Sequence, residues 1–270
     1  MQRGFLSYKG FPDMKILTCN IRYLGAEDGD NGWKYRKDFC AEIIKSQSAD
    51  MICFQEVWKQ QFEDLHRALP GYQTFGMADV PQGRNPQNCI FYRKNKFNFI
   101  SSGGYWLSET PHVPGSRSWD SACIRLANWI RLEVLNTKTE FRIVNTHLDH
   151  VAQEARENQA RIIVEDTKAY QEDYPQILTG DMNCDFSNKA IKVFKSGGWI
   201  DTFEAVHGNG NPGHTYHEFK GSECVSDIGK MDWIFMRGKI RATDAEVIKD
   251  CRNGKFPSDH YFVSATVDLL

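Results

Sequence analysis

Short β-type runs alternate with amphipathic helical segments along the whole chain, and this alternation constrains the fold more than any other feature. Apolar runs predict strands over residues 14–21, 50–55, 89–92, 129–135, 141–146, 176–179, 231–236 and 261–267. Apolar residues at helical spacing predict helices over residues 33–46, 58–69 and 151–170. Because no linker or repeat interrupts this order, we expect a single α/β domain in which two sheets pack face to face with helices outside.

The regular pattern begins at Met14, which sets the expected domain boundaries. We expect residues 14–270 to form the domain and residues 1–13 to be a leader or a loose arm. This first segment has basic residues but lacks the apolar stretch of ~7–15 residues that a signal peptide requires. Two stretches, residues 109–121 and 205–230, are rich in Gly, Pro, Ser or His and are expected to be surface loops.

Charge and cysteine content argue against several classes of protein. The 33 Lys and Arg residues against 35 Asp and Glu residues give a net charge of −2, which argues against nucleic-acid binding through bulk positive charge. No run approaches the ~18–20 apolar residues of a membrane span. The eight cysteines include no Cys-x-x-Cys pair, so we expect free thiols and a cytoplasmic location. We also expect a monomer.

Polar side chains recur at the ends of the predicted strands. Carboxylate, amide and imidazole groups stand there at Asn20, Glu56, His147, Asp181, Asn183, Asp232, Asp259 and His260. Each of them alone could be a turn residue or a strand cap. Strand ends that face one edge of a sheet can converge on one cleft, so the set as a whole predicts an active site.

The order and strand context of these residues resemble the endonuclease/exonuclease/phosphatase superfamily, the DNase I-like group. The motifs are Asn20, Gln55-Glu56, Asn145-Thr-His147, Gly180-Asp181-Met-Asn183, Met231-Asp232-Trp-Ile234 and Ser258-Asp259-His260. They cover residues 14–268, and residues 104–129 resemble a bacterial branch of unassigned substrate. The resemblance implies a four-layer α/β/β/α sandwich of two mostly antiparallel sheets, and Mg²⁺-dependent hydrolysis of phosphoesters.

The expected metal ligands follow from the chemistry of magnesium. Mg²⁺ binds hard oxygen ligands, commonly one or two carboxylates together with water and substrate phosphate. Glu56 and Asp259 are the strongest candidates, with Asn20 supplying an amide oxygen and Mn²⁺ as a substitute ion. The resemblance further implies that Asp181 orients or deprotonates the attacking water, and that Asn183 holds this water or the phosphate. The number of metal ions stays open.

Two histidines are expected to contact the phosphate. Asp232 would accept a hydrogen bond from His260 and favour its imidazolium form, which could then donate to a phosphate oxygen. His147 would do the same from the other side. The sequence does not identify the carboxylate partner of His147, because Asp149 is two residues along and its direction is open.

The expected substrate contacts are Arg125 and Trp119. Arg125 matches a position where relatives carry a phosphate-facing arginine, and a guanidinium suits a phosphate. Trp119 and Arg117 lie in the Gly/Pro-rich loop, where they could stack on or clamp a substrate ring. A surface arginine and an aromatic residue that only fills the loop are the alternatives.

Other interpretations of the sequence are weaker. His214 and His217 have zinc-like spacing but no third ligand, and the segment from Asp28 lacks the downstream Glu of a calcium loop. We therefore predict a phosphodiesterase or phosphatase acting on a phosphoester of modest size. The alternatives are a nuclease or deadenylase acting on DNA or RNA ends, and an inactive scaffold that only binds.

Overall fold

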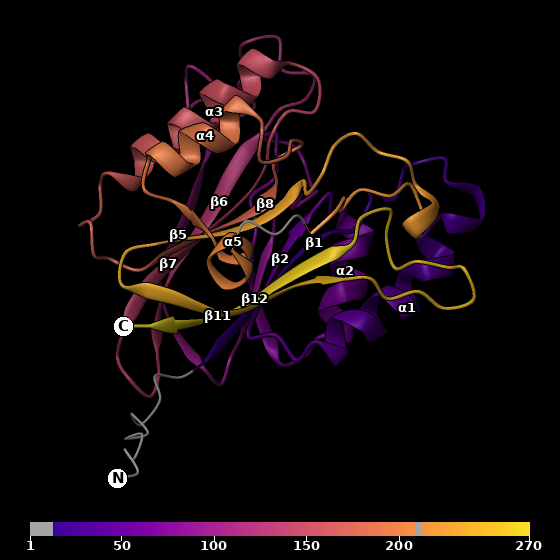
Figure 1. The fold of residues 1–270 in the computed structure, drawn as a ribbon, viewed down its shortest axis with the longest axis horizontal. Coiled ribbons are helices and arrows are strands. Elements are labelled where there is room, and N and C mark those ends of the chain that lie inside the picture. Colours follow the sequence, from indigo (N-terminus) through magenta and orange to yellow (C-terminus); the bar gives the residue numbers. More distant parts are fainter. Residues whose placement is uncertain (1–12, 209–211) are drawn as a thin grey trace.

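The computed structural model describes residues 13–208 and 212–270. Almost all of the predicted leader, residues 1–12, lies outside this described part. The described chain forms four layers, with two six-stranded sheets in the middle and helices on both outer faces (Figure 1). Each sheet contains one parallel strand pair and is otherwise antiparallel. The predicted α/β/β/α sandwich is confirmed.

The two sheets have related strand orders. The first has the order β11 (Ile240–Ile248), β12 (Phe262–Leu269), β1 (Met14–Asn20), β2 (Met51–Gln55), β4 (Ile90–Arg93) and β3 (Tyr72–Phe75). The second has the order β5 (Phe97–Trp106), β6 (Leu126–Val134), β7 (Glu140–His147), β8 (Gln176–Asp181), β10 (Asp232–Arg237) and β9 (Ile200–Asp201). The parallel pairs are β1 with β2 and β7 with β8, near the middle of each sheet. Parallel neighbours end at the same edge, so the polar residues that follow them are brought together.

The helices cover opposite outer faces of the sandwich. Helices α1 (Trp33–Ser46) and α2 (Lys59–Ala68) pack on the first sheet, and α3 (Gln153–Thr167) and α4 (Lys189–Ser196) on the second (Figure 1). The short helix α5 (Thr202–His207) and two 3₁₀ turns, Gly29–Asn31 and Gly221–Glu223, complete the helical elements of the described chain.

Three apolar clusters hold the four layers together, one at each interface. On β1, Leu17 and Cys19 face the helices, whereas Ile16 faces the other sheet. On β8, Leu178 faces α3 and α4, and Ile177 faces the inter-sheet core. This alternation is the period-2 pattern of a strand buried on both faces, which explains why the central strands read as continuous apolar runs in the sequence.

The largest differences from the predicted elements lie at the edges of the sheets. Strands β3, β5 and β11 and helix α4 were not predicted, and α5 occupies part of the expected loop at residues 205–230. Strand β6 begins three residues before its predicted start at residue 129. Edge strands expose much of their surface, so β5 and β11 carry polar residues without a clear apolar alternation.

A buried polar network joins the two sheets directly beneath the strand ends. Gln55 Nε2 donates to Asn145 Oδ1 over 2.7 Å, and Asn145 Nδ2 donates to the carbonyl of Phe54 over 2.8 Å. Thr179 Oγ1 also donates to Asn145 Oδ1. Satisfied buried networks favour one relative placement of the elements that they join. The network therefore fixes the end of β2 against the ends of β7 and β8.

Two further predictions from the sequence concern the cysteines and membrane-spanning segments. All eight cysteines are free, as the sequence predicts. No helix in residues 13–208 or 212–270 has the length and apolar character that crossing a bilayer requires.

Candidate active site

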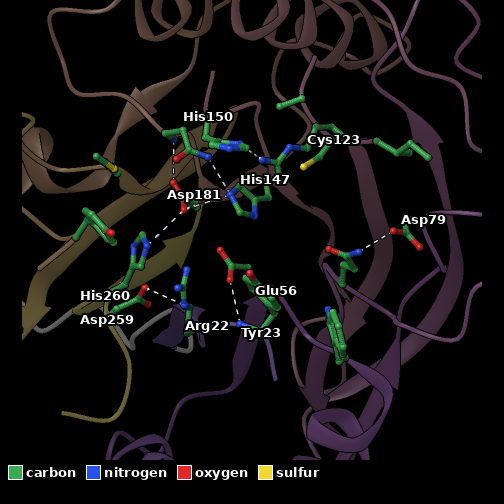
Figure 2. A pocket seen from close by; sticks show the side chains of 18 of the residues that line it. Arg22, Tyr23, Glu56, Asp79, Cys123, His147, His150, Asp181, Asp259 and His260 are labelled. Atoms are coloured by element: carbon green, nitrogen blue, oxygen red, sulfur yellow. Dashed lines mark hydrogen bonds and ion pairs between the residues drawn. The ribbon is translucent and has the colours of Figure 1, made fainter. Parts of the chain in front are cut away.

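The predicted strand-end residues surround one cleft. This cleft has a volume of about 810 Å³. Six of the predicted side chains line it: Glu56, His147, Asp181, Asn183, Asp259 and His260 (Figure 2). Asn20 and Asp232 are buried directly behind this lining, where they contact Asp181 and His260 respectively. Strand ends from both sheets therefore supply the site.

Asp181 is the central carboxylate of the cleft. It ends β8 and is 1% exposed. Its Oδ1 accepts from the backbone N–H of Asn183 over 2.8 Å, and its Oδ2 accepts from Asn20 Nδ2 over 3.0 Å. Burial, together with the charge of Asp232, raises the pKa of Asp181 to about 7, against the opposing effect of His260 and the two donors. A carboxyl group with this pKa can accept a proton near neutral pH.

The glycine before Asp181 is required by close strand packing. Gly180 has φ 150°, and a Cβ atom there would lie 2.1 Å from the carbonyl oxygen of Thr146 on β7. Only glycine lets β7 and β8 approach this closely at their ends. The Gly-Asp sequence thus places the carboxylate of Asp181 beside His147, whose Nε2 lies 3.4 Å from Asp181 Oδ2.

His260 and Asp232 form a buried ion pair. His260 Nδ1 donates to Asp232 Oδ2 over 2.9 Å, and His260 Nε2 lies 3.8 Å from Asp181 Oδ2. Burial acts to lower the pKa of His260, but the charge and hydrogen bond of Asp232, with the charges of Asp181 and Asp259, raise it to about 10. The imidazole is therefore charged at neutral pH, and its Nε2 can donate to an anion in the cleft.

We predict that Asp232→Asn changes the pH dependence of kcat/KM. Without the partner carboxylate, the pKa of His260 falls, and a histidine of pKa ~6.5 is protonated in only about 1% of molecules at pH 8.5. Relative to the parent, kcat/KM of the variant should fall by about 100-fold between pH 6 and 8.5. A matched control is Asp268→Asn, a buried carboxylate paired with Arg241 on the outer strands. Parallel pH profiles for Asp232→Asn and the parent would contradict this role of His260.

His147 differs from His260 in its protonation state. Asn183 Nδ2 donates to His147 Nε2 over 2.9 Å and to the carbonyl of Leu148 over 2.9 Å. Burial, with the nearby Arg125 and His260 cations and with His150, lowers the pKa of His147 well below its usual range. The ring is thus neutral and accepts a hydrogen bond. This differs from the expected phosphate donor, because tertiary burial and neighbouring cations oppose the charge.

Asp149 does not pair with His147. Its two carboxylate oxygens accept from Ser121 Oγ, from the backbone N–H of Ala122 and from the backbone N–H groups of residues 151 and 152. It therefore ties the loop at residues 121–122 to the turn before α3. The carboxylate nearest to His147 is that of Asp181.

Glu56 and Asp259 offer oxygen atoms for a metal ion at the cleft. Glu56 has φ 63° directly after β2, and its carboxylate accepts from Asn20 Nδ2 and from the backbone N–H of Tyr23, each over 3.0 Å. Burial and the charge of Glu56 raise the pKa of Asp259, although the His260, Arg22 and Arg36 cations oppose the rise. A carboxylate whose charge a neighbouring carboxylate disfavours fits a divalent cation bound through oxygen.

Asn20 is oriented differently from the expected metal ligand. Its Oδ1 accepts from the backbone N–H of Arg22 over 3.0 Å, and its Nδ2 donates to both Glu56 and Asp181. In this arrangement the amide orients two carboxylates and does not point its oxygen into the cleft. Asn20 lies on the first sheet and Asp181 on the second, so the hydrogen bond between their side chains also joins the two sheets.

One group of side chains in the described chain has the spacing of metal ligands. Asp181, Asp232 and His260 each offer one ligand atom, and these atoms lie within 4.8 Å of one another. Nδ1 of His260 already forms a hydrogen bond with Asp232, and a charged imidazole opposes the binding of a cation. Glu56 and Asp259 offer oxygen atoms alone, which is the donor type that a hard ion such as magnesium prefers.

Of the two predicted substrate contacts, one lines the cleft and the other does not. Arg125 lines the cleft, whereas half-buried Trp119 is not among the residues that line it. The aromatic wall comes instead from Tyr23 and Trp58, whose ring centroids are 5.6 Å apart. Trp58 is two residues after Glu56, and this position just past a predicted strand end could have identified it from the sequence as a cleft residue.

Arg22, Tyr216 and His150 also line the cleft and were not predicted as site residues. Arg22 Nε lies 3.5 Å from Asp259 Oδ2 (Figure 2). The guanidinium of Arg22 also donates to both oxygens of Asp28. Asp28, for which the sequence analysis disfavours a calcium site, thus forms an ion pair with Arg22.

The fold and this site define a phosphoester hydrolase of the DNase I-like class. The sequence profile of the Endonuclease/Exonuclease/phosphatase family matches residues 17–260, and the chain belongs to this family.

Solved structures and curated proteins of several activities are similar to the chain. An endonuclease/exonuclease/phosphatase from Bacteroides vulgatus is 31% identical with a TM-score of 0.88, and the match covers 96% of this chain and 100% of that one. The Bacteroides thetaiotaomicron mannosyl-6-phosphatase Bt3783 is 28% identical with a TM-score of 0.85, covering 94% and 99%. Nocturnin from Drosophila melanogaster is 29% identical, covering 96% of this chain and 47% of that protein. The chain likewise spans less than half of the Ccr4 exoribonuclease subunits that it matches.

Proposed function

We propose that the chain is a Mg²⁺-dependent phosphatase or phosphodiesterase that acts on small phosphoesters. The observation that carries this proposal is the cleft centred on Asp181, with a charged His260 and the carboxylates of Glu56 and Asp259 around it. Such a site combines a proton acceptor, a cationic donor and oxygen ligands, which are the groups that phosphoester hydrolysis requires.

Glu56 and Asp259 would hold the metal ion, which Mn²⁺ could replace. When bound, it supplies positive charge to the phosphate oxygens and lowers the pKa of water. Asp181 orients the attacking water and accepts its proton. Asn183, whose backbone N–H already holds Asp181, keeps that carboxylate in position. His260 donates through Nε2 to a phosphate oxygen as negative charge develops there.

The cleft favours a small substrate. Three arginines line it, but the carboxylate of Asp79 lines it as well and accepts from Gln87 over 2.7 Å (Figure 2). A carboxylate there disfavours the next phosphate of a polynucleotide. The similarity to a mannosyl-6-phosphatase over nearly the whole of both chains supports a sugar phosphate as the substrate. Tyr23 and Trp58 offer an aromatic face for a sugar ring.

The second candidate is a nuclease or deadenylase that acts on RNA or DNA ends. The similarity to Nocturnin and to Ccr4 exoribonuclease subunits supports it. The same aromatic pair could stack on a terminal base, because base–aromatic stacking does not depend on sequence.

Salt dependence separates these two candidates. A single strand held through several phosphates releases counterions, so log kcat/KM falls with log salt by ~0.7 per contact. Among the described residues, the arginines that line the cleft are Arg22, Arg117 and Arg125, so we predict a slope of at most about 2. We also predict a preference for mannose 6-phosphate over a single-stranded oligonucleotide. The measurement is kcat/KM on both substrates over a range of salt at fixed Mg²⁺. A slope above about 4 with faster cleavage of the oligonucleotide would favour the nuclease.

A further inference from the structure

Asp79 and Gln87 form a polar pair in the lining of the cleft, and both are half-buried. Asp79 Oδ2 accepts from Gln87 Nε2 over 2.7 Å, and Asp79 Oδ1 accepts from the backbone N–H of Val80 over 3.0 Å. Because a carboxylate can only accept, Gln87 presents its amide nitrogen to Asp79 and keeps its amide oxygen for another donor. Within the described chain, no donor bonds to this oxygen and no cation forms an ion pair with Asp79. The pair therefore keeps acceptor sites that the protein does not use.

The loop that carries this pair is held at several points. Trp106 Nε1 on β5 donates to the carbonyl of Asp79 over 2.7 Å. The backbone N–H of Val57 donates to the carbonyl of Gln87 over 3.2 Å, directly after the end of β2. Asn128 on β6 also donates through Nδ2 to a carbonyl of this loop, over 3.0 Å. Groups that are already ordered lose little further freedom when they bind a ligand.

The pair is separate from the groups proposed to act on the phosphate. Figure 2 shows Asp181 and His260 on one side of Glu56 and Asp79 on the other. Asp79 shares no hydrogen bond or ion pair with these three residues in the described chain. All four line one cleft, so a substrate whose phosphate lies near Asp181 can extend past Glu56 to Asp79. The part of the substrate that reaches Asp79 is then the leaving alcohol.

Trp58 gives this part of the cleft an aromatic wall. Its ring packs against the turn after β1, because a Cβ atom at Gly25 would lie 2.5 Å from Trp58 Cη2. The backbone N–H of Lys59 donates over 3.0 Å to Asn85 Oδ1, which joins the segment after Trp58 to the loop of Asp79. Aromatic rings with a few well-placed polar groups orient small ligands. The ring can pack on the C–H groups of a sugar, and the polar pair can accept from its hydroxyl groups.

The chemistry of the pair argues against two other leaving groups. A second phosphate or a carboxylate would meet the negative charge of Asp79, which no cation of the described chain pairs with. An apolar alcohol would cover the acceptors of Asp79 and Gln87 without supplying donors, which costs free energy. An uncharged group with several hydroxyls satisfies both residues.

We propose that Asp79 and Gln87 form a hydroxyl-binding subsite, and that the leaving group is an uncharged polyol that packs on Trp58, as in a hexose phosphate. This inference rests on the proposed function and specifies the leaving group of its substrate. One hydroxyl donates to the carboxylate of Asp79, and a second hydroxyl donates to the amide oxygen of Gln87. A hydrogen bond to a charged group corresponds to a preference of about 10- to 100-fold.

The test compares two esters that differ in their hydroxyl groups. Cyclohexylmethyl phosphate has the ring size and primary ester of mannose 6-phosphate but no hydroxyls. Initial rates of phosphate release at fixed Mg²⁺ give kcat/KM for both esters, and the parent should prefer mannose 6-phosphate by about 10-fold or more. Asp79→Asn should lower this ratio by about 10-fold and Gln87→Ala by about 5-fold. Gln82→Ala, an exposed glutamine of the same loop outside the cleft lining, is the matched control and should keep the parental ratio.

The outcomes separate this inference from the function on which it rests. A parent that hydrolyses both esters with a ratio near one would overturn the subsite and leave the proposed function standing. Equal losses on both esters in the two variants would also overturn it, because a displaced loop and not a lost hydroxyl contact would explain them. If Asp79→Asn does not fold, the parent ratio and Gln87→Ala still decide. A parent that hydrolyses neither ester would overturn the proposed function and the inference together.

Discussion

Asp181→Asn is expected to lower kcat by at least about 100-fold, because a positioned general base typically contributes ~10²–10⁴-fold. Asparagine keeps the size of the side chain and an oxygen to accept from the backbone N–H of Asn183, but it cannot take a proton from water. Substrate affinity should therefore change little. The measurement is single-turnover and steady-state phosphate release together with a direct binding assay.

The control for this variant lies on the same loop. Asp185 accepts from Ser187 and does not line the cleft, so Asp185→Asn should keep parental kcat. If both Asp181→Asn and Asp185→Asn kept near-parental turnover, the proton acceptor would have to be a group other than Asp181.

Glu56→Gln is expected to remove most turnover at low Mg²⁺ with little loss of folding. Changes to the groups around a metal site commonly cost 10–100-fold in metal affinity, and loss of a ligand itself should cost at least about 100-fold. Glutamine keeps the size of the side chain and an oxygen that can accept from the backbone N–H of Tyr23, so the fold should be retained. High Mg²⁺ should restore part of the activity.

Metal binding can be measured without turnover. An ion that binds only the folded protein raises its thermal midpoint, so Mg²⁺ should stabilise the parent more than Glu56→Gln. Glu63→Gln, an exposed carboxylate on α2, is the matched control. An equal Mg²⁺-induced shift in Glu56→Gln and the parent would place the ion elsewhere, with the group of Asp181, Asp232 and His260 as the next candidate.

The sequence predicted the centre of the fold better than its margins. Strands β1, β2, β7 and β8 are buried on both faces, so their apolar runs are evident in the sequence. Strands β5 and β11 pair on one side only and carry exposed polar residues, and tertiary pairing rather than local pattern makes them strands.

The site shows the same division between local and tertiary information. The positions of Asp181 and His260 follow from strand ends, which the sequence reveals. The neutral state of His147 depends on cations from other segments, and the amide orientation of Asn20 depends on Arg22 and two distant carboxylates. The choice between Trp119 and Trp58 as the cleft aromatic depends on loop conformation, which the sequence pattern does not encode.

Phosphate release from small phosphoesters in the presence and absence of chelator tests the central claim most directly. The parent protein is assayed on mannose 6-phosphate and on a small phosphodiester with Mg²⁺, then with excess EDTA, and then with Mg²⁺ or Mn²⁺ added back. The account predicts hydrolysis that EDTA abolishes and that either ion restores. Undiminished hydrolysis in excess EDTA would contradict it.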